Sequence, residues 1–169
     1  MNFANTNQPP KYASVVERNF VPYLSVGNPG VRYLRHPNGV IVITLAPLFA
    51  GKEIESFSWE TSQKKSSVDR SKLQIIGKGK RGGLQLFPDS KLCIIRCKDG
   101  SELVIRAGIR ATLVEVNYER LSNAPNLALT EAISGLGYLA IVVPSGSDGR
   151  NLLHVPKELT LEVESIGNL

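Results

Sequence analysis

The feature that most constrains this chain is its division into short apolar runs separated by glycine- and proline-containing turns. The run 40–45 is almost continuously apolar and rich in β-branched residues, which is typical of a buried strand. An Asn-Gly pair within the preceding segment 36–39 favours a tight hairpin, because both central residues of such a turn tolerate a positive φ. The segment 98–100 gives the same signal between the runs 91–97 and 101–106. This spacing predicts a mostly β protein, a compact sandwich or barrel of seven or eight short strands.

Further strands are expected where apolar and polar residues alternate, or where a short apolar run ends at proline. They cover 31–35, 53–60, 72–76, 84–87, 109–116 and 137–143, the last of these closed by Pro144. The alternation in 53–60 is imperfect, because Phe57 and Trp59 share one face whereas Ile54 falls on the opposite, serine-bearing face. The connecting segments 61–71, 122–131 and 145–150 are interpreted as loops.

Helical signals are short and lie outside these runs. Ser14 can cap one or two turns over 15–20, which Pro22 then stops, and Asn117 can cap a short helix over 118–121. The segment 156–166 is ambiguous, because its leucines alternate as in a strand whereas its leading proline favours a helix. Residues 1–12 are predicted to form a flexible tail, and 13–169 a single domain.

The positive charge of the chain is concentrated in one segment. The chain has 20 basic and 15 acidic residues, a net charge of +5, yet the segment 61–82 alone carries +6, so the remainder is close to neutral. Seven basic residues stand there against the single acid Asp69: Lys64, Lys65, Arg70, Lys72, Lys78, Lys80 and Arg81. A local field of this kind attracts acidic protein surfaces, nucleic acid or anionic lipid. We name this stretch the basic segment; it contains no aromatic residue for base stacking.

The motifs associated with chemistry are absent or stand in the wrong context. Residues 77–82 match G-x-G-x-x-G, but a leucine-rich run ending at Pro88 follows instead of the helix that a dinucleotide site needs. Cys93 and Cys97 lie four apart on one expected strand, too far to bridge each other, and are interpreted as buried thiols. His36 and His154 lie far apart in sequence. We therefore expect no catalytic residue, no metal site, no cofactor and no membrane span.

A first set of motifs keeps its order over 31–165. A strand with the pattern V-x-V-N ends at Asn117, a proline-containing loop and the small turn 135–137 follow, and an apolar strand then runs to Pro144. This order resembles the glycine cleavage system H-protein. The resemblance implies a barrel-sandwich hybrid with peripheral helices, and tilts the ambiguous 156–166 toward a helix. The carrier position of that family falls on Gly100, so the resemblance implies the scaffold without its carrier lysine, and Lys98 is a less favoured carrier candidate.

A second, more specific set of motifs covers roughly residues 13–165. It comprises G-K-G-K-R-G at 77–82, Leu92-Cys93, Cys97-x-Asp99-Gly100, Arg110, Leu113-x-Glu115-Val116-Asn117 and Tyr138-x-Ala140-x-Val142-x-Pro144. Jointly these motifs resemble the Abitram (Simiate) family. The motif positions expected to be structural are Gly77, Gly82, Asp99, Gly100, Glu115, Asn117, Gly137 and Pro144.

The Abitram resemblance implies a function without catalysis. That family is described as actin-binding and as a nuclear modulator of transcription, which implies a place in the nucleus, including nuclear speckles, and at the cytoskeleton and cell projections. We expect the basic segment to contact actin. The alternative is a nuclear adaptor that binds nucleic acid such as RNA, or nuclear proteins, through the same seven basic residues.

Overall fold

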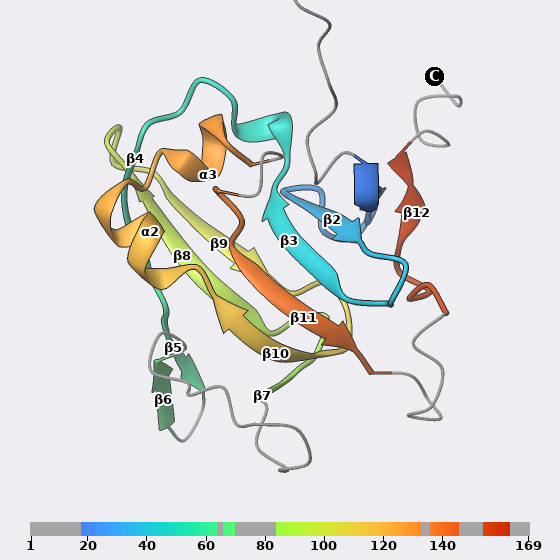
Figure 1. Cartoon of the computed structure of the whole chain (residues 1–169). Coiled ribbons are helices and arrows are strands. Elements are labelled where there is room, and N and C mark those ends of the chain that lie inside the picture. The colour runs from blue at the N-terminus through green and yellow to red at the C-terminus, as the bar shows by residue number, and fades with distance from the viewer. Residues whose placement is uncertain (1–17, 64–65, 70–83, 133–135, 146–153, 163–169) are drawn as a thin grey trace, which may run out of the picture.

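The computed structural model describes residues 18–63, 66–69, 84–132, 136–145 and 154–162. In these residues the chain forms a seven-stranded sheet, a three-stranded sheet and a two-stranded hairpin, all antiparallel (Figure 1). The predicted mostly β fold class is confirmed, and the architecture is consistent with a sandwich or barrel-like fold. The expected seven or eight strands are too few, because the described residues contain twelve. The predicted tail, 1–12, lies outside the described residues.

The larger sheet joins segments from both ends of the chain. In spatial order its strands are β12 (Thr160–Leu161), β1 (Val21–Leu24), β2 (Val31–Arg35), β3 (Ile41–Leu45), β11 (Ala140–Pro144), β10 (Ala111–Val116) and β7 (Leu84–Leu86). β2 and β3 pair along their whole length, from Val31 opposite Leu45 to Arg35 opposite Ile41. The strand expected at 137–143 begins only at Ala140 and includes Pro144.

The smaller sheet lies behind β3, β11 and β10 in the view of Figure 1. Its strands are β4 (Ile54–Ser58), β8 (Lys91–Cys97) and β9 (Glu102–Arg106), with β8 in the centre. The side chains of Cys93 and Ile95 on β8 belong to the same buried cluster as Tyr33 of β2 and Ile43 of β3. Both cysteines are buried and neither forms a disulfide, as predicted. The core therefore fills the space between the two sheets.

A β-bulge explains the imperfect alternation in β4. Ile54 pairs with Cys97 but Ser56 pairs with Arg96, so one extra residue, Glu55, is inserted between them. An inserted residue moves the side chain before it to the other face of the strand. Ile54 is therefore 2% exposed and belongs to the same buried cluster as Trp59, contrary to the predicted face assignment.

Two stretches predicted to be loops contain regular structure. In 61–71 the chain forms a hairpin of β5 (Glu60–Gln63) and β6 (Ser66–Asp69), whose ladder needs no apolar alternation. In 122–131, α2 (Tyr118–Asn123) continues beyond its expected end and α3 (Leu127–Thr130) follows Pro125. Ala128 of α3 is fully buried, so tertiary packing supports a helix too short to be stable alone. A further 3-10 turn, η1, spans Pro47–Phe49.

The first and last strands of the described residues, β1 and β12, pair at one edge of the larger sheet. Tyr23 and Leu24 of β1 pair with Leu161 and Thr160 of β12, so the helix implied here by the H-protein resemblance is wrong for these residues. The alternation of apolar residues in 156–166, rather than its leading proline, indicated the observed strand. Pro22 lies within β1, but β12 pairs only with Tyr23 and Leu24. The missing N–H of Pro22 therefore removes no hydrogen bond between β1 and β12. Arg18 and Asn19 are helical, within the helix predicted at 15–20.

Both predicted hairpin turns are present, but their geometry differs from the prediction. Gly100 N–H donates to the Cys97 carbonyl at 3.0 Å, and Cys97 N–H donates to the Ser101 carbonyl at 2.9 Å. Among the described residues only glycines have a positive φ, with Gly100 at 86° and Gly39 at 96°. The asparagine and aspartate before them are not left-handed. These are type I turns followed by a left-handed glycine in a bulge, rather than turns with two left-handed residues.

A buried tyrosine hydroxyl joins the two sheets. The Tyr33 hydroxyl on β2 donates to the Ala107 carbonyl after β9 at 2.7 Å, and accepts from the Asn28 side-chain amide at 2.8 Å. Asn28 also donates to the Arg106 carbonyl at 3.0 Å. A Cβ atom on Gly108 would lie 2.0 Å from the Tyr33 hydroxyl oxygen, so the close approach requires glycine there. Desolvation by burial raises the pKa of Tyr33 to about 12.

We predict that Tyr33→Phe lowers the free energy of unfolding by about 1–3 kcal/mol, because the buried Ala107 carbonyl then loses its partner. Chemical denaturation of the purified protein measures this change. Tyr118→Phe is the matched control, since Tyr118 is 46% exposed, and it should change stability by less than about 0.5 kcal/mol. Equal effects of the two substitutions would contradict the assigned role of the Tyr33 hydroxyl.

Candidate functional site

The described residues do not include the seven predicted partner-binding residues. Lys64, Lys65, Arg70, Lys72, Lys78, Lys80 and Arg81 lie outside the described part of the chain, as do the motif glycines Gly77 and Gly82 and the strand predicted at 72–76. Their assignment to a binding surface stays a prediction. The structure does describe the residues just before and just after the basic segment.

Both ends of the basic segment are attached to the core. Before it, the Trp59 ring stacks on Phe57 with 5.6 Å between ring centroids, and Trp59 is only 3% exposed. After it, Leu86 of β7 is fully buried and pairs with Ala111 of β10. The chain therefore returns to the same framework at a fixed register. Figure 1 shows β7 at the margin of the larger sheet, beside β10.

A cation of the described surface lies close to the exit from the basic segment. The Arg110 guanidinium carbon lies 5.5 Å from the centroid of the Phe87 ring, within cation–π distance. Phe87 directly follows β7 and is 47% exposed. Arg110 is one of the motif residues singled out in the sequence, which gave no signal for its contact with Phe87.

Asn117, between β10 and α2, is hydrogen-bonded to the segment just before β11. Its side-chain amide donates to the carbonyls of Leu136 and Tyr138, both at 3.0 Å, while its backbone N–H donates to Leu139 at 3.0 Å. Asn117 occupies the N-cap position of α2 as predicted, but its side chain makes no capping hydrogen bond. The predicted capping role is thus wrong, because the amide points to a segment about twenty residues further along the chain.

Two further motif positions lie beside Asn117. The Tyr138 hydroxyl donates to the Glu115 carboxylate at 2.5 Å. Desolvation by burial, followed by the hydrogen bond and the negative charge of Glu115, raises the pKa of Tyr138 to about 12. A Cβ atom on Gly137 would lie 1.9 Å from the Leu127 carbonyl oxygen of α3, so no other residue fits without backbone movement. Glu115, Asn117 and Gly137 form one packed cluster, which we name the asparagine cluster. Pro144 lies outside it, opposite Ala111.

Asp99 and Gly100 hold the tip of the β8–β9 hairpin. The Asp99 carboxylate accepts from the Ser101 backbone N–H at 2.8 Å and from the Ser101 hydroxyl, and it lies 3.3 Å from the Lys52 amine. The Ser101 hydrogen bonds, with a smaller effect of Lys52, lower the pKa of Asp99 to about 2. The Lys98 amine, two residues before the carrier position that the H-protein resemblance implies at Gly100, lies 3.4 Å from the Glu53 carboxylate.

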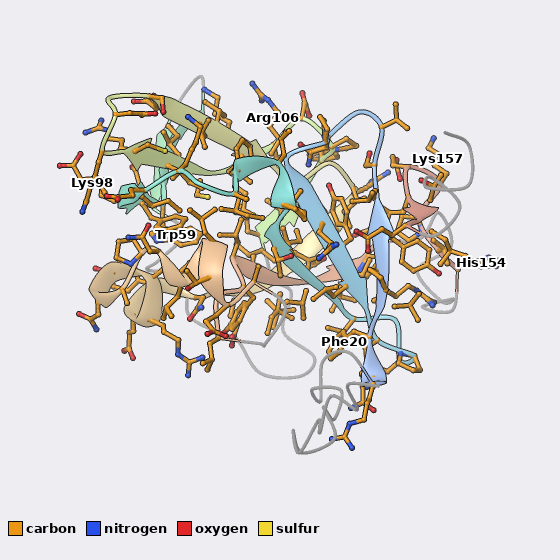
Figure 2. The ribbon with its side chains drawn as sticks, turned by 90° about the horizontal axis from the view of Figure 1, so that it is seen from above. Phe20, Trp59, Lys98, Arg106, His154 and Lys157 are labelled. Atoms are coloured by element: carbon orange, nitrogen blue, oxygen red, sulfur yellow. The ribbon has the colours of Figure 1, made fainter. Side chains whose placement is uncertain are left out.

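The described residues offer little for covalent or metal chemistry. Among them, no three His, Cys, Asp or Glu side chains gather into a group that could hold a metal ion. No helix in the described residues is long and apolar enough to cross a membrane. His154 is exposed (Figure 2). The expectation of no catalytic residue therefore stays a prediction, with no contrary observation in the described part.

Comparison with known proteins places the chain in a family. Protein Abitram of Bos taurus is 34% identical over 152 residues, which cover 85% of this chain and 79% of that protein. The chain belongs to the Abitram family. Protein Abitram of Gallus gallus is 40% identical over 123 residues, 70% of this chain and 68% of that protein. An uncharacterised protein of Caenorhabditis elegans is 46% identical over 131 residues, 78% of this chain and 81% of that protein. No family model matches the sequence.

The family assignment made from the motifs is thus confirmed. The structure gives the Abitram motifs distinct physical roles: Asp99 and Gly100 shape a turn, while Glu115, Asn117 and Gly137 pack into the asparagine cluster. The sequence gave no signal for Tyr138 as the partner of Glu115. These contacts join segments that are distant in the sequence, so the asparagine cluster positions the strands.

We predict that Glu115→Gln lowers the pKa of Tyr138, because the substitution removes the negative charge that opposes ionisation of the tyrosine. The raised pKa of Tyr138 contributes stability that is fully present below pH 10 and is lost as the pH rises toward about 12. Spectroscopic titration of the five tyrosines, with Tyr138→Phe to identify the transition, measures the shift. An identical titration curve for the Glu115→Gln variant would contradict this contact.

Proposed function

We propose that this member of the Abitram family is a non-enzymatic actin-binding protein of the nucleus and cytoplasm, which docks on acidic actin surface through its basic segment. The observation that carries the proposal is the concentration of charge: +6 within 61–82, on a chain whose total charge is +5. The remainder is close to neutral, so attraction to an acidic partner would be directed to one place.

The attachment of the basic segment supports a docking role. Trp59 before it and Leu86 after it are buried in one core, so the charges are tethered at both ends to the same framework. Tethering both ends lowers the number of conformations that binding must restrict, compared with a free charged tail. Arg110, beside Phe87 at the exit, adds one more exposed cation near the end of the segment.

The second candidate is a nuclear adaptor that binds nucleic acid through the same residues. The charge concentration favours this candidate as well, since lysine and arginine neutralise phosphates regardless of sequence. The basic segment lacks the aromatic residues on which single-stranded bases stack. A nucleic-acid complex would therefore depend mainly on charge and weaken steeply with salt, which separates the two candidates experimentally.

We predict that reversing Lys78, Lys80 and Arg81 to Glu weakens cosedimentation with actin filaments by at least about tenfold, because three attractive charges become repulsive. Cosedimentation at low and near-physiological salt, with a polynucleotide competitor in parallel, measures the effect. The wild-type protein should pellet saturably at physiological salt and resist the competitor.

The matched control reverses three exposed basic residues of the described surface, Lys98, Arg120 and Lys157, which changes the total charge by the same amount. This control should pellet like the wild type, and both variants should keep the wild-type melting temperature. Unchanged actin affinity of the basic-segment variant would contradict the assignment of these residues to the actin-binding surface. Pelleting that disappears with modest salt, or passes wholly to the polynucleotide, would favour the nucleic-acid adaptor.

A further inference from the structure

The strand β9 forms an outer edge of the three-stranded sheet. In the spatial order β4-β8-β9 it pairs with β8, and the described residues contain no strand on its other side. Its sequence is Glu-Leu-Val-Ile-Arg over Glu102–Arg106, with opposite charges at the two ends and apolar residues between them. An edge strand presents a row of backbone groups on which another strand can pair.

The hydrogen bonds of the hairpin fix which groups of β9 face outward. Cys97 N–H donates to the Ser101 carbonyl at 2.9 Å, so that pair is hydrogen-bonded, and the pairs alternate along an antiparallel ladder. Leu103 and Ile105 therefore direct their N–H and C=O groups to β8, while those of Glu102, Val104 and Arg106 point away. The Arg106 carbonyl agrees with this direction, because it accepts from the Asn28 side chain outside the ladder.

The side chains of the same three residues are exposed. Ile105 is 3% exposed and faces the core, whereas Glu102, Val104 and Arg106 are all exposed, Val104 at 42%. Figure 2 shows Arg106 at the margin of the molecule, on the side of the three-stranded sheet. One face of the edge thus carries an acid, an exposed valine and a base in that order.

We propose that this edge pairs with β9 of a second copy of the chain, antiparallel and centred on Val104. In that register Val104 faces Val104 of the partner subunit, and Glu102 faces Arg106 of the partner subunit at both ends. The three outward-facing residues of each strand supply both donors and acceptors for the new ladder, and a two-fold axis through Val104 makes every contact occur twice. Two three-stranded sheets would then form one continuous six-stranded sheet.

Charge is the argument for a second copy as the occupant. Edge strands are often protected by charged side chains, lysine above all, and like charges directly opposite one another destabilise a strand pair. Here the opposite signs at the two ends of β9 make the strand complementary to its own antiparallel image. Directly opposed opposite charges stabilise strand pairs, and like charges destabilise them.

The present partners of these side chains leave room for the new contacts. Arg106 Nη1 donates to the Asp89 carbonyl at 2.6 Å, and a guanidinium has five donors in all. Glu102 lies 3.6 Å from Arg96 of β8, an exposed ion pair that a carboxylate can share with a second cation. Asn28 uses one of the two lone pairs of the Arg106 carbonyl oxygen, so the other can accept from the partner.

Charge complementation between two variants tests this register. Glu102→Arg places arginine opposite Arg106 of the partner subunit, and Arg106→Glu places glutamate opposite glutamate, so each variant alone should dimerise at least about tenfold more weakly than the wild type. Mixed together, the two variants oppose Arg to Glu at both ends and should form a heterodimer. The combined variant E102R/R106E should dimerise like the wild type. Analytical ultracentrifugation over a wide range of protein concentration measures all of these, because a small interface gives a concentration-dependent dimer.

The matched control is Arg96→Glu, which removes the same ion pair as Glu102→Arg but lies on the central strand β8. It should dimerise like the wild type, and thermal melting checks that every variant folds. A wild-type protein that is monomeric at all concentrations would overturn the proposal. So would a dimer indifferent to the single reversals, or a mixture of folded variants that forms no heterodimer. The test does not involve actin, so its result is independent of the proposed function.

Discussion

The buried Tyr33 hydroxyl is the contact on which the relation of the two sheets depends. Apolar packing alone draws two sheets together but fixes their relative position poorly, since one aliphatic contact substitutes for another. Tyr33 instead joins β2 to the chain after β9, because its hydroxyl donates to the buried Ala107 carbonyl and accepts from the half-buried Asn28 amide. The Tyr33 hydroxyl also constrains its neighbours. Gly108 must lack a side chain, and the Asn28 amide must reach both the hydroxyl and the Arg106 carbonyl. The position of β9, and with it the outer edge of the smaller sheet, follows from these contacts.

Sequence periodicity predicted most strands because it reports which side chains face a core. It was misleading where a strand departs from regular pairing. The bulge at Glu55 reversed the face of Ile54, and a second irregularity separates Leu113 from Glu115 in β10. The only local sign of the bulge in β4 was the imperfect alternation of 53–60, which does not by itself show that a residue is inserted or which face Ile54 takes. The polar hairpin of β5 and β6 was missed for a related reason: its ladder uses backbone groups, which every sequence contains.

The charge of the basic segment could be predicted from the sequence, whereas the contacts of the motif residues could not. Net charge is a property of composition, so the basic segment was evident without any structure. The role of Asn117 was not, because an asparagine before a helix looks like a cap, while its actual partners are the carbonyls of Leu136 and Tyr138. The motifs identified the family without revealing that Glu115, Asn117 and Gly137 share one cluster. Such contacts between distant segments are set by the tertiary fold.

The two proposed surfaces would act together, although they respond differently to salt. The basic segment attracts through net charge, which ionic strength screens, whereas a strand pair also gains backbone hydrogen bonds and has equal numbers of opposed charges. A β9-paired dimer would carry two basic segments on one rigid frame. Against a filament, which repeats the same acidic surface, the second segment would bind at a high effective concentration once the first had docked. The dimer would then bind a filament with high avidity, because both basic segments engage. Its affinity for a single actin subunit, which only one segment contacts, would stay low. On this argument, self-pairing of β9 would make the protein selective for assembled over unassembled partner, with no new contact to the partner itself.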